Sequence, residues 1–210
     1  YIPGVGVDTD KFGTSLEQKN ENRNKKRQEL GIPDDKFVLL SVGELQDRKN
    51  QRVILEALHE KNNPNIYYWA VGKGELLPEY KQMIKKYGLE ERVRLLGFRT
   101  DIVELCNAAD CFVHPSVREG LGIAPLEAMA TGLPLISSYV NGIKDYTEEG
   151  VSGCCLINPV SVVEMRQAIE KMYEDEEFRK SCGINNLETV KKFDIKNTDE
   201  IMKNIYSKFL

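Results

Sequence analysis

Short apolar segments alternate with amphipathic segments along most of the chain. The apolar segments are four to six residues long and several end at a glycine, as residues 37–42 do at Gly43, whereas the amphipathic segments place apolar residues three and four apart. The first pattern predicts buried strands and the second predicts helices. The predicted strands are residues 37–42, 67–71, 93–96, 111–114, 133–137 and 153–157. The predicted helices are residues 23–30, 52–59, 76–87, 102–107, 125–130, 162–173, 176–191 and 198–209.

This alternation indicates a parallel sheet built from strand–helix–strand units. The strands lack a regular polar alternation, which is typical of a sheet covered by helices on both faces. We therefore predict an α/β fold: a doubly wound, Rossmann-like parallel sheet of about six strands, with helices on both faces and a C-terminal helical tail. Residues 1–22, polar and rich in turn formers, are predicted to be a linker region, residues 23–194 the sheet domain, and residues 195–210 a terminal helix.

The carboxyl ends of the strands are where such a fold binds its ligands. The loops at these ends are residues 43–50, 72–75, 97–101, 114–123 and 138–142. Glycine begins the first three loops, which permits tight turns and a close approach of the backbone to a ligand. Candidate ligand-binding residues are therefore expected in these loops.

Charge and cysteine content narrow the class of protein. The 29 basic and 33 acidic residues give a formal net charge of −4, whereas nucleic-acid binding depends on clustered cationic charge and is not expected here. No apolar run approaches the roughly 20 residues needed to cross a bilayer. The five cysteines include no Cys-x-x-Cys pair and the chain has two histidines, so no zinc site is expected. We interpret the cysteines as buried apolar residues in a reducing cytosol.

The strongest local motif is the run REGLGIAPLEAMA at residues 118–130. Two glycines precede a predicted helix, and Pro125 in its first turn gives up an amide hydrogen that would have no partner within the helix. The remaining free amides and the positive end of the helix dipole favour an anion. Glu119, in the loop, and Glu127, placed in the first helical turn, would bracket a phosphate-bearing ligand. The glycine pattern alone is common to several folds and does not identify that ligand.

The longer run EGLGIAPLEAMATGLPLIS resembles the Glu-x7-Glu signature of the group 1, or family 4, glycosyltransferases. Other segments are similar to that family in the same order: IPGVGVD, SVGEL followed by Lys49-Asn50, AVGKG, LGFRTD, and the segment from Ala109 to Ser116. The resemblance covers nearly the whole chain and is nearest to the enzymes of bacterial capsule and exopolysaccharide assembly. It implies the donor-binding C-terminal half of a retaining enzyme with the two-domain GT-B fold, the acceptor site belonging to an N-terminal half outside this chain.

The resemblance implies roles for the residues of the Glu-x7-Glu run. Glu127 would accept hydrogen bonds from the ribose diol, and Glu119 would lie near the hydroxyls of the transferred sugar. Backbone amides would hold the distal phosphate and the sugar; these amides belong to Gly120, Leu121, Gly122 and Ile123.

The loops after the first and third strands supply the other implied contacts. Lys49 would neutralise the leaving diphosphate as its charge develops, with Gly43 in the same loop. Phe98 and Arg99 would lie near the base, which the family often reads through backbone groups.

One residue departs from the family pattern. At the position of Glu44 many members have an arginine that partners the lysine on the diphosphate. A carboxylate would repel phosphate, so Arg48 becomes the candidate for the second positive charge. The resemblance implies no essential metal and no cofactor, because Lys49 and the helix amides would neutralise the charge of the diphosphate in place of a metal ion.

Each candidate also has a structural interpretation. Glu127 could instead stabilise its helix by interacting with the helix dipole. Glu119 could be a solvated acid of the loop, and Lys49 a lysine of the surface. Phe98 is as readily a core residue. His114, at the end of a buried strand and without a nucleophile motif, is interpreted as structural rather than catalytic.

We therefore expect a hexosyltransferase-type enzyme that moves a sugar from a nucleotide-diphosphate sugar, with UDP as the expected nucleotide, to an acceptor hydroxyl in polysaccharide or glycoconjugate biosynthesis. A glycan or lipid-linked acceptor would bind the N-terminal half, so the chain alone is expected to be inactive. Its expected location is the cytoplasm, free or peripheral at the inner face of the cytoplasmic membrane. Two alternatives stay open: a sugar-nucleotide epimerase, and a non-catalytic nucleotide-binding domain, which the Glu44 departure favours.

Overall fold

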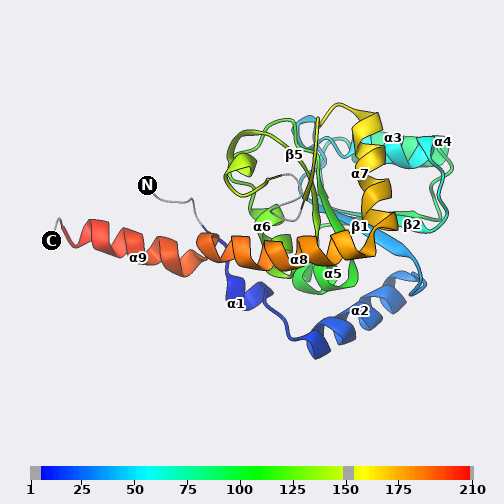
Figure 1. Ribbon diagram of the computed structural model, residues 1–210. Helices are drawn as coiled ribbons and strands as arrows, with labels where there is room; N and C mark the ends of the chain where they lie inside the picture. The colour runs from blue at the N-terminus through cyan, green and yellow to red at the C-terminus, as the bar shows by residue number, and fades with distance from the viewer. Residues whose placement is uncertain (1–5, 149–153, 209–210) are drawn as a thin grey trace.

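The computed structural model describes residues 6–148 and 154–208. Within them the chain forms a parallel sheet of six strands in the order β3-β2-β1-β4-β5-β6, with helices on both faces (Figure 1). The strands are β1 (Phe37–Val42), β2 (Ile66–Val71), β3 (Val93–Gly97), β4 (Cys111–His114), β5 (Leu135–Ser138) and β6 (Cys154–Ile157). The helices are α1 (Thr9–Phe12), α2 (Leu16–Leu30), α3 (Arg52–Glu60), α4 (Leu77–Lys86), α5 (Ile102–Ala108), α6 (Ile123–Ala130), α7 (Val162–Glu174), α8 (Glu176–Val190) and α9 (Ile195–Tyr206), with 3-10 segments η1 (Asp47–Lys49), η2 (Asn141–Asp145) and η3 (Lys191–Phe193). The predicted doubly wound fold is confirmed, and its strand order reverses between β1 and β4.

Two hydrophobic cores lie on the two faces of the sheet. Phe37 and Leu39 of β1 pack into the core formed with α3, α4 and α7, whereas Val38 and Leu40 pack into the core formed with α5 and α6. Val38, Leu39 and Leu40 have no exposed surface. Because successive residues of a strand point to opposite faces, burial on both sides explains a continuous apolar run where one-sided burial would give alternation.

The carboxyl ends of β1, β2 and β3 lie side by side. β1 and β2 pair in register to their last residues, Val42 opposite Val71. The pairing continues into the loops, where the amide of Gly43 donates to the carbonyl of Val71 (2.9 Å) and the amide of Gly72 donates to the carbonyl of Gly97 (2.8 Å). The three glycine-led loops predicted to bind a ligand therefore meet at one edge of the sheet.

Gly74 lets the loop after β2 lie directly on the loop after β1. A Cβ atom at this position would lie 2.2 Å from the carbonyl oxygen of Leu45. Gly74→Ala is therefore expected to lower the free energy of unfolding by about 3 kcal/mol, because the backbone must move. Gly120→Ala is the control: no atom of the described residues lies within 4 Å of its added Cβ, so its effect should stay below about 0.5 kcal/mol. Equal urea midpoints for the two variants would contradict this close packing.

Helix α2 begins well before the predicted helix at 23–30 and occupies part of the predicted linker region 1–22. Ser15 caps it, with its hydroxyl accepting a hydrogen bond from a first-turn amide (3.2 Å). The helix has almost no apolar stripe, so periodicity gives no signal for its first turns. Polar groups attach it instead: Arg23 and Arg27 both donate to a backbone carbonyl at the end of α5.

The other predicted elements agree with the structure to within three residues at either end. The short helix α1 and the 3-10 segments were not predicted, since one turn of helix is too short to show a period. Residues 153 and 209, which belong to a predicted strand and a predicted helix, lie outside the described residues.

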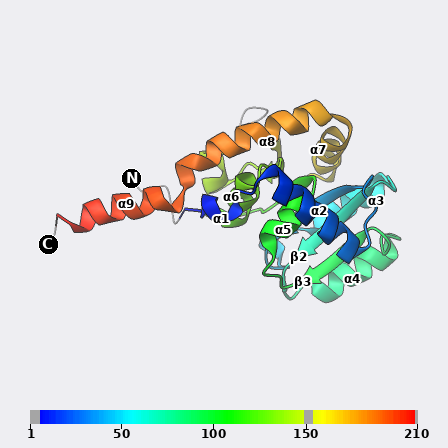
Figure 2. The ribbon, with the colours of Figure 1, turned by 90° about the horizontal axis from the view of Figure 1, so that it is seen from below.

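Helices α8 and α9 form a long arm at the C-terminal end of the chain. In Figures 1 and 2 α8 runs across the sheet domain, and α9 continues beyond it. The base of α9 is paired with the first described residues: the amide of Val7 donates to the carbonyl of Phe193 (2.8 Å), and the amide of Ile195 donates to the carbonyl of Val7 (2.9 Å). The first described residues are therefore fastened to the base of α9, where that helix leaves the domain.

Candidate functional site

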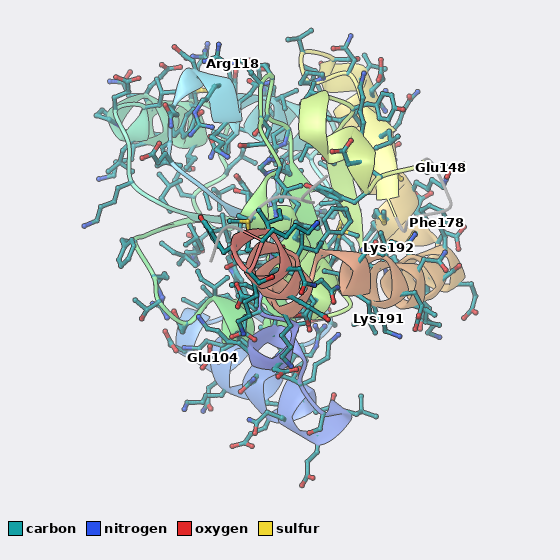
Figure 3. The ribbon with its side chains drawn as sticks, turned by 90° about the vertical axis from the view of Figure 1, so that its left-hand side faces the viewer. Glu104, Arg118, Glu148, Phe178, Lys191 and Lys192 are labelled. Carbon is teal, nitrogen blue, oxygen red and sulfur yellow. The ribbon has the colours of Figure 1, made fainter. Side chains whose placement is uncertain are left out.

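Two loops far apart in the sequence meet at the carboxyl edge of the sheet. η1, after β1, carries Arg48 and Lys49, and the loop after β4 carries Glu119. The Lys49 ammonium forms an ion pair with Glu119 Oε2, and Arg48 Nη1 lies 3.7 Å from Glu119 Oε1. The amide of Val117 donates to the carbonyl of Arg48 (2.9 Å), which joins the two loops through their backbones. In Figure 3 the labelled Arg118 marks this loop, at the end of the molecule opposite α2.

Glu119 is the centre of a hydrogen-bonded cluster. Its Oε2 atom also contacts His114 Nε2 (3.2 Å) and Ser116 Oγ (3.3 Å). The hydrogen bond from His114, followed by that from Lys49, holds the pKa of Glu119 well below its usual range. Burial lowers the pKa of His114, so its imidazole is neutral at pH 7. The cluster is therefore an ionised carboxylate whose Oε2 atom is held by one cation and two neutral donors, with Arg48 beside Oε1.

Glu44, the departure from the family pattern, lies on the outside of this cluster. Its side chain is exposed, and its Oε2 atom lies 3.6 Å from Arg48 Nη2. Arg48 therefore lies between Glu44 and Glu119. Arg48 and Lys49 contact the same carboxylate, so Arg48 is placed where a substitute for the family arginine would be needed. That Arg48 binds a diphosphate stays a prediction.

The helix that follows the Glu119 loop starts two residues earlier than predicted. Gly122 caps α6 with a φ of 75°, a conformation that favours glycine, so the helix begins at Ile123 and Pro125 is its third residue. Glu127 therefore lies in the second turn, and the prediction of a first-turn carboxylate is wrong. Among the described residues, the backbone amides of residues 120–124 donate no backbone hydrogen bond. They remain available to an anion.

Glu127 lies apart from the Lys49–Glu119 cluster. Its half-buried side chain forms no hydrogen bond or ion pair with any part of the chain that the structure describes. Burial raises its pKa, and the positive charge of Lys11 opposes that rise. Burial raises the pKa of Cys106 in α5, and the negative charge of Glu127 adds to that rise. A half-buried acid without a partner is costly to the fold, which is the expected mark of a binding group.

A cavity of about 460 Å³ opens at the carboxyl ends of β1, β2 and β3. Its size is within the range of small-molecule sites. The stem of Lys49 passes Gly43, whose added Cβ would lie 3.5 Å from Lys49 Cδ, so the cavity adjoins the cluster. The lining residues are Val42, Gly43, Glu44, Val71, Gly72, Lys73, Phe98, Arg99 and Ile102.

Phe98 and Arg99 both line this cavity, in different ways. The side chain of Phe98 is 70% exposed, so its interpretation as a core residue is wrong. The guanidinium of Arg99 instead binds Asp101 (2.7 Å) and Glu29 of α2 (2.8 Å), which raises its pKa. Arg99 therefore fixes the loop after β3 to α2, and its charge is neutralised inside the protein.

A larger cavity of about 670 Å³ lies at the opposite edge of the sheet, between α2 and α8. Leu16, Lys19 and Ile184 are among its lining residues, and none of the predicted site residues is. Its size does not make it the better candidate, because ligands of doubly wound sheets bind at the carboxyl ends of the strands.

His114 and Ser116 belong to the cluster although the sequence did not assign them a function. His114 was interpreted as structural, and Ser116 was quoted only as part of a family segment. The available signal was their position, since both lie at the end of β4 and within five residues of Glu119.

Three further features of the described residues, 6–148 and 154–208, concern metal binding, membrane spans and the cysteines. They contain no group of three or more His, Cys, Asp or Glu side chains arranged to hold a metal ion. None of their helices is both long and apolar enough to cross a membrane. The cysteines whose burial is described, Cys106, Cys111, Cys155 and Cys182, are all buried.

Comparison with known families matches the family of glycosyl transferases group 1 to residues 22–189. The chain belongs to the group 1 glycosyltransferases. EpsD of Bacillus subtilis, a relative named as a putative glycosyltransferase, is 32% identical over an alignment of 213 positions that covers all of this chain and 54% of EpsD. The UDP-Gal:alpha-D-GlcNAc-diphosphoundecaprenol alpha-1,3-galactosyltransferase of Escherichia coli is 38% identical over 142 residues, covering 65% of the chain and 36% of that enzyme.

Solved structures agree with this group 1 assignment. HepE of Anabaena, crystallised with UDP-glucose, superposes with a TM-score of 0.87 at 30% identity, over 96% of this chain and 56% of HepE. WaaG, a glycosyltransferase involved in lipopolysaccharide biosynthesis, superposes with a TM-score of 0.77 at 26% identity, over 92% of the chain and 54% of WaaG. The chain is therefore one half of a GT-B fold, as predicted, and spans about half the length of relatives such as EpsD.

Proposed function

We propose that this group 1 glycosyltransferase chain binds the nucleotide-sugar donor, and that the whole enzyme moves the sugar to an acceptor hydroxyl with retention of configuration. The observation that carries the proposal is that Lys49 and Arg48 both lie against Glu119, which directly precedes the free amides of residues 120–124, beside a cavity large enough for a nucleoside. Cations and helix amides favour a diphosphate, and the cavity would take the base.

The diphosphate competes with Glu119 for Lys49. In the structure the Lys49 ammonium is paired with that carboxylate. A bound diphosphate supplies more negative charge, so Lys49 turns toward it and Glu119 is released to accept hydrogen bonds from the sugar. In the front-face reaction, the bond between sugar and phosphate breaks while the acceptor oxygen bonds to the sugar carbon from the same side, and the proton of the acceptor hydroxyl passes to the departing phosphate oxygen. Lys49, Arg48 and the amides stabilise the charge that develops on the leaving diphosphate.

Helix α9 supports an association with an N-terminal half. Ile195, Ile205 and Tyr206 are partly or largely exposed on a helix that extends beyond the sheet domain. Such a face needs a partner to cover it. We infer that α9 packs against the N-terminal half, which would bind a glycan or lipid-linked acceptor. The expected setting is the cytoplasm, with a UDP-sugar as donor and no essential metal.

The test is a transfer assay with this chain joined to the N-terminal half of its own protein. Labelled UDP-, GDP- and ADP-sugars are offered with candidate acceptors, and the anomeric configuration of the product is read by NMR. The proposal predicts a glycoside with the configuration of the donor, and no transfer by the 210-residue chain alone. An inverted product contradicts retention, an epimerised nucleotide sugar supports the epimerase, and transfer by the isolated chain contradicts the division of labour.

Substitution of Glu127 offers a second test, because it should weaken the binding of UDP without lowering the stability of the fold. Because burial raises its pKa in the folded state, ionisation of Glu127 destabilises the fold as the pH rises through that range. Glu127→Gln should therefore keep or raise the melting temperature at pH 8, while the affinity for UDP falls about tenfold through loss of charged hydrogen bonds to the ribose diol.

The control for Glu127→Gln is Glu104→Gln, which removes a partly buried acid of α5 that lies away from the Arg118 loop (Figure 3). It should leave UDP affinity unchanged. A 2′,3′-dideoxy analogue of UDP should bind the wild type and Glu127→Gln equally. If Glu127→Gln bound the analogue about tenfold more weakly than the wild type does, as predicted for UDP, the carboxylate would not act through the ribose hydroxyls.

A further inference from the structure

Three donors converge on one oxygen of Glu119. Oε2 is bound by Lys49 Nζ, by His114 Nε2 (3.2 Å) and by Ser116 Oγ (3.3 Å), whereas among the described residues Oε1 has only Arg48 Nη1, at 3.7 Å. The two carboxylate oxygens therefore differ: Oε2 is anchored to the protein, and Oε1 is open to a ligand.

The hydrogen bonding fixes the tautomer of His114. An ionised carboxylate can only accept, so the contact between His114 Nε2 and Glu119 Oε2 requires a proton on Nε2. Ser116 Oγ lies 3.1 Å from the same nitrogen and donates its own hydrogen to Glu119. The neutral imidazole thus acts as a donor, and no positive charge is needed on it.

Both holding residues are rigidly placed. His114 is 3% exposed and Ser116 is fully buried. The ring of His114 stacks on that of Phe112, with centroids 6.4 Å apart, and the hydroxyl of Ser138 donates to the carbonyl of Ser116. Side chains locked in this way can hold a partner at little further cost in entropy.

We propose that His114 and Ser116 are positioning residues, which keep Glu119 Oε2 anchored when Lys49 turns to the diphosphate, so that Oε1 faces the hydroxyls of the transferred sugar. The inference rests on the proposed donor site and explains how the Glu119 carboxylate keeps its orientation within it. Lys49 is the one donor of the three that the diphosphate attracts, because His114 and Ser116 are neutral. The two neutral donors therefore remain on Glu119 in both states.

The first experiment measures affinity of the 210-residue chain for UDP, UDP-glucose and UDP-galactose by calorimetry. His114→Phe removes the Nε2 donor, and Ser116→Ala removes the hydroxyl. We expect each to weaken the better-bound UDP-sugar about tenfold while UDP itself changes less than threefold. His114→Gln, whose amide can donate in place of Nε2, should restore at least part of the loss. Ser41→Ala, which removes a buried serine that contacts Tyr68 and not Glu119, should change neither affinity.

A double-mutant cycle separates positioning from a general structural effect. If His114 acts through Glu119, then His114→Phe placed on Glu119→Gln should cause no further loss of UDP-sugar affinity. An equal loss in both backgrounds, or an equal loss for UDP and the UDP-sugars, overturns the proposal. Should His114→Phe fail to fold, Ser116→Ala carries the same cycle. A wild type that binds neither UDP nor UDP-sugars contradicts the donor site itself, and this inference with it.

The second experiment reads the tautomer directly. The chain has two histidines, so ¹⁵N spectra of the wild type and of His59→Gln assign the His114 signals. The proposal predicts the Nε2–H tautomer at pH 7, both without ligand and with saturating UDP. An Nδ1–H tautomer, an imidazolium, or loss of the Nε2–H signal on adding UDP would overturn it.

Discussion

Lys49→Ala is expected to lower sugar transfer by the whole enzyme by about 10²–10³-fold, mainly in kcat. Removing one preorganised group that stabilises charge in a transition state typically has this effect. Lys49 is paired with Glu119, the residue that directly precedes the open amides of residues 120–124. Among the described residues of this cluster, Arg48 would be the one cation left to the diphosphate. Steady-state kinetics with the donor at saturation check the prediction.

Arg52→Ala is the matched control for Lys49→Ala. Arg52 lies one turn further along the chain and pairs with Glu79 of α4, so its loss removes a cation from the same region without touching the cluster. Transfer by Arg52→Ala should remain within about threefold of wild type. If Lys49→Ala also remained within that range, its role at the diphosphate would be excluded and the non-catalytic alternative would gain.

Arg27→Met is expected to lower the free energy of unfolding by about 3–5 kcal/mol, the range for breaking a buried ion pair from one side. The Arg27 side chain has no exposed surface and binds Asp110 Oδ2 (2.7 Å), and its other nitrogen–hydrogen groups donate to backbone carbonyls, including those of Ala108 (3.1 Å) and Lys36 (2.8 Å). The same Asp110 oxygen accepts from the amide of Val38 at the start of β1. Methionine would fill much of the space and leave the carboxylate without its buried cation.

Arg23→Met is the control for this prediction. Arg23 binds the other oxygen of Asp110 at 2.8 Å, but its side chain is 30% exposed, so water can replace it and the expected cost is about 1 kcal/mol or less. Urea unfolding of both variants at pH 7 makes the comparison. Similar midpoints for Arg23→Met and Arg27→Met would contradict the view that Arg27 fastens α2 to the sheet.

The role of Arg27 also explains why the sheet could be predicted from the sequence more accurately than the first helices. The strands are visible in the sequence because burial on both faces demands apolar residues throughout, as in Phe37–Val42. Helix α2 is anchored through Arg27, and a single buried charge has no period. The start of α6 was misplaced for a related reason: the positive φ of Gly122 defines it, whereas the sequence signal was Pro125.

The sequence could predict which residues belong to the candidate site, but not which of them contact one another. Lys49 and Glu119 could be chosen because each lies in a loop at the carboxyl end of a strand. Their ion pair could not, because it depends on how two loops 70 residues apart approach each other. The same limit applies to Arg99, whose guanidinium turns from the cavity to Asp101, and to His114, whose partner is fixed by the bend of the chain after β4.

The central claim is that a diphosphate binds against Lys49 at the carboxyl edge of the sheet. Calorimetric titration of the purified chain with UDP, GDP, ADP and UMP tests it most directly. The account predicts that one nucleoside diphosphate, expected to be UDP, binds with one-to-one stoichiometry, that UMP binds at least tenfold more weakly, and that Lys49→Ala removes this advantage of the diphosphate. Equal affinity of wild type and Lys49→Ala for UDP, or no binding of any of the four nucleotides, would contradict it.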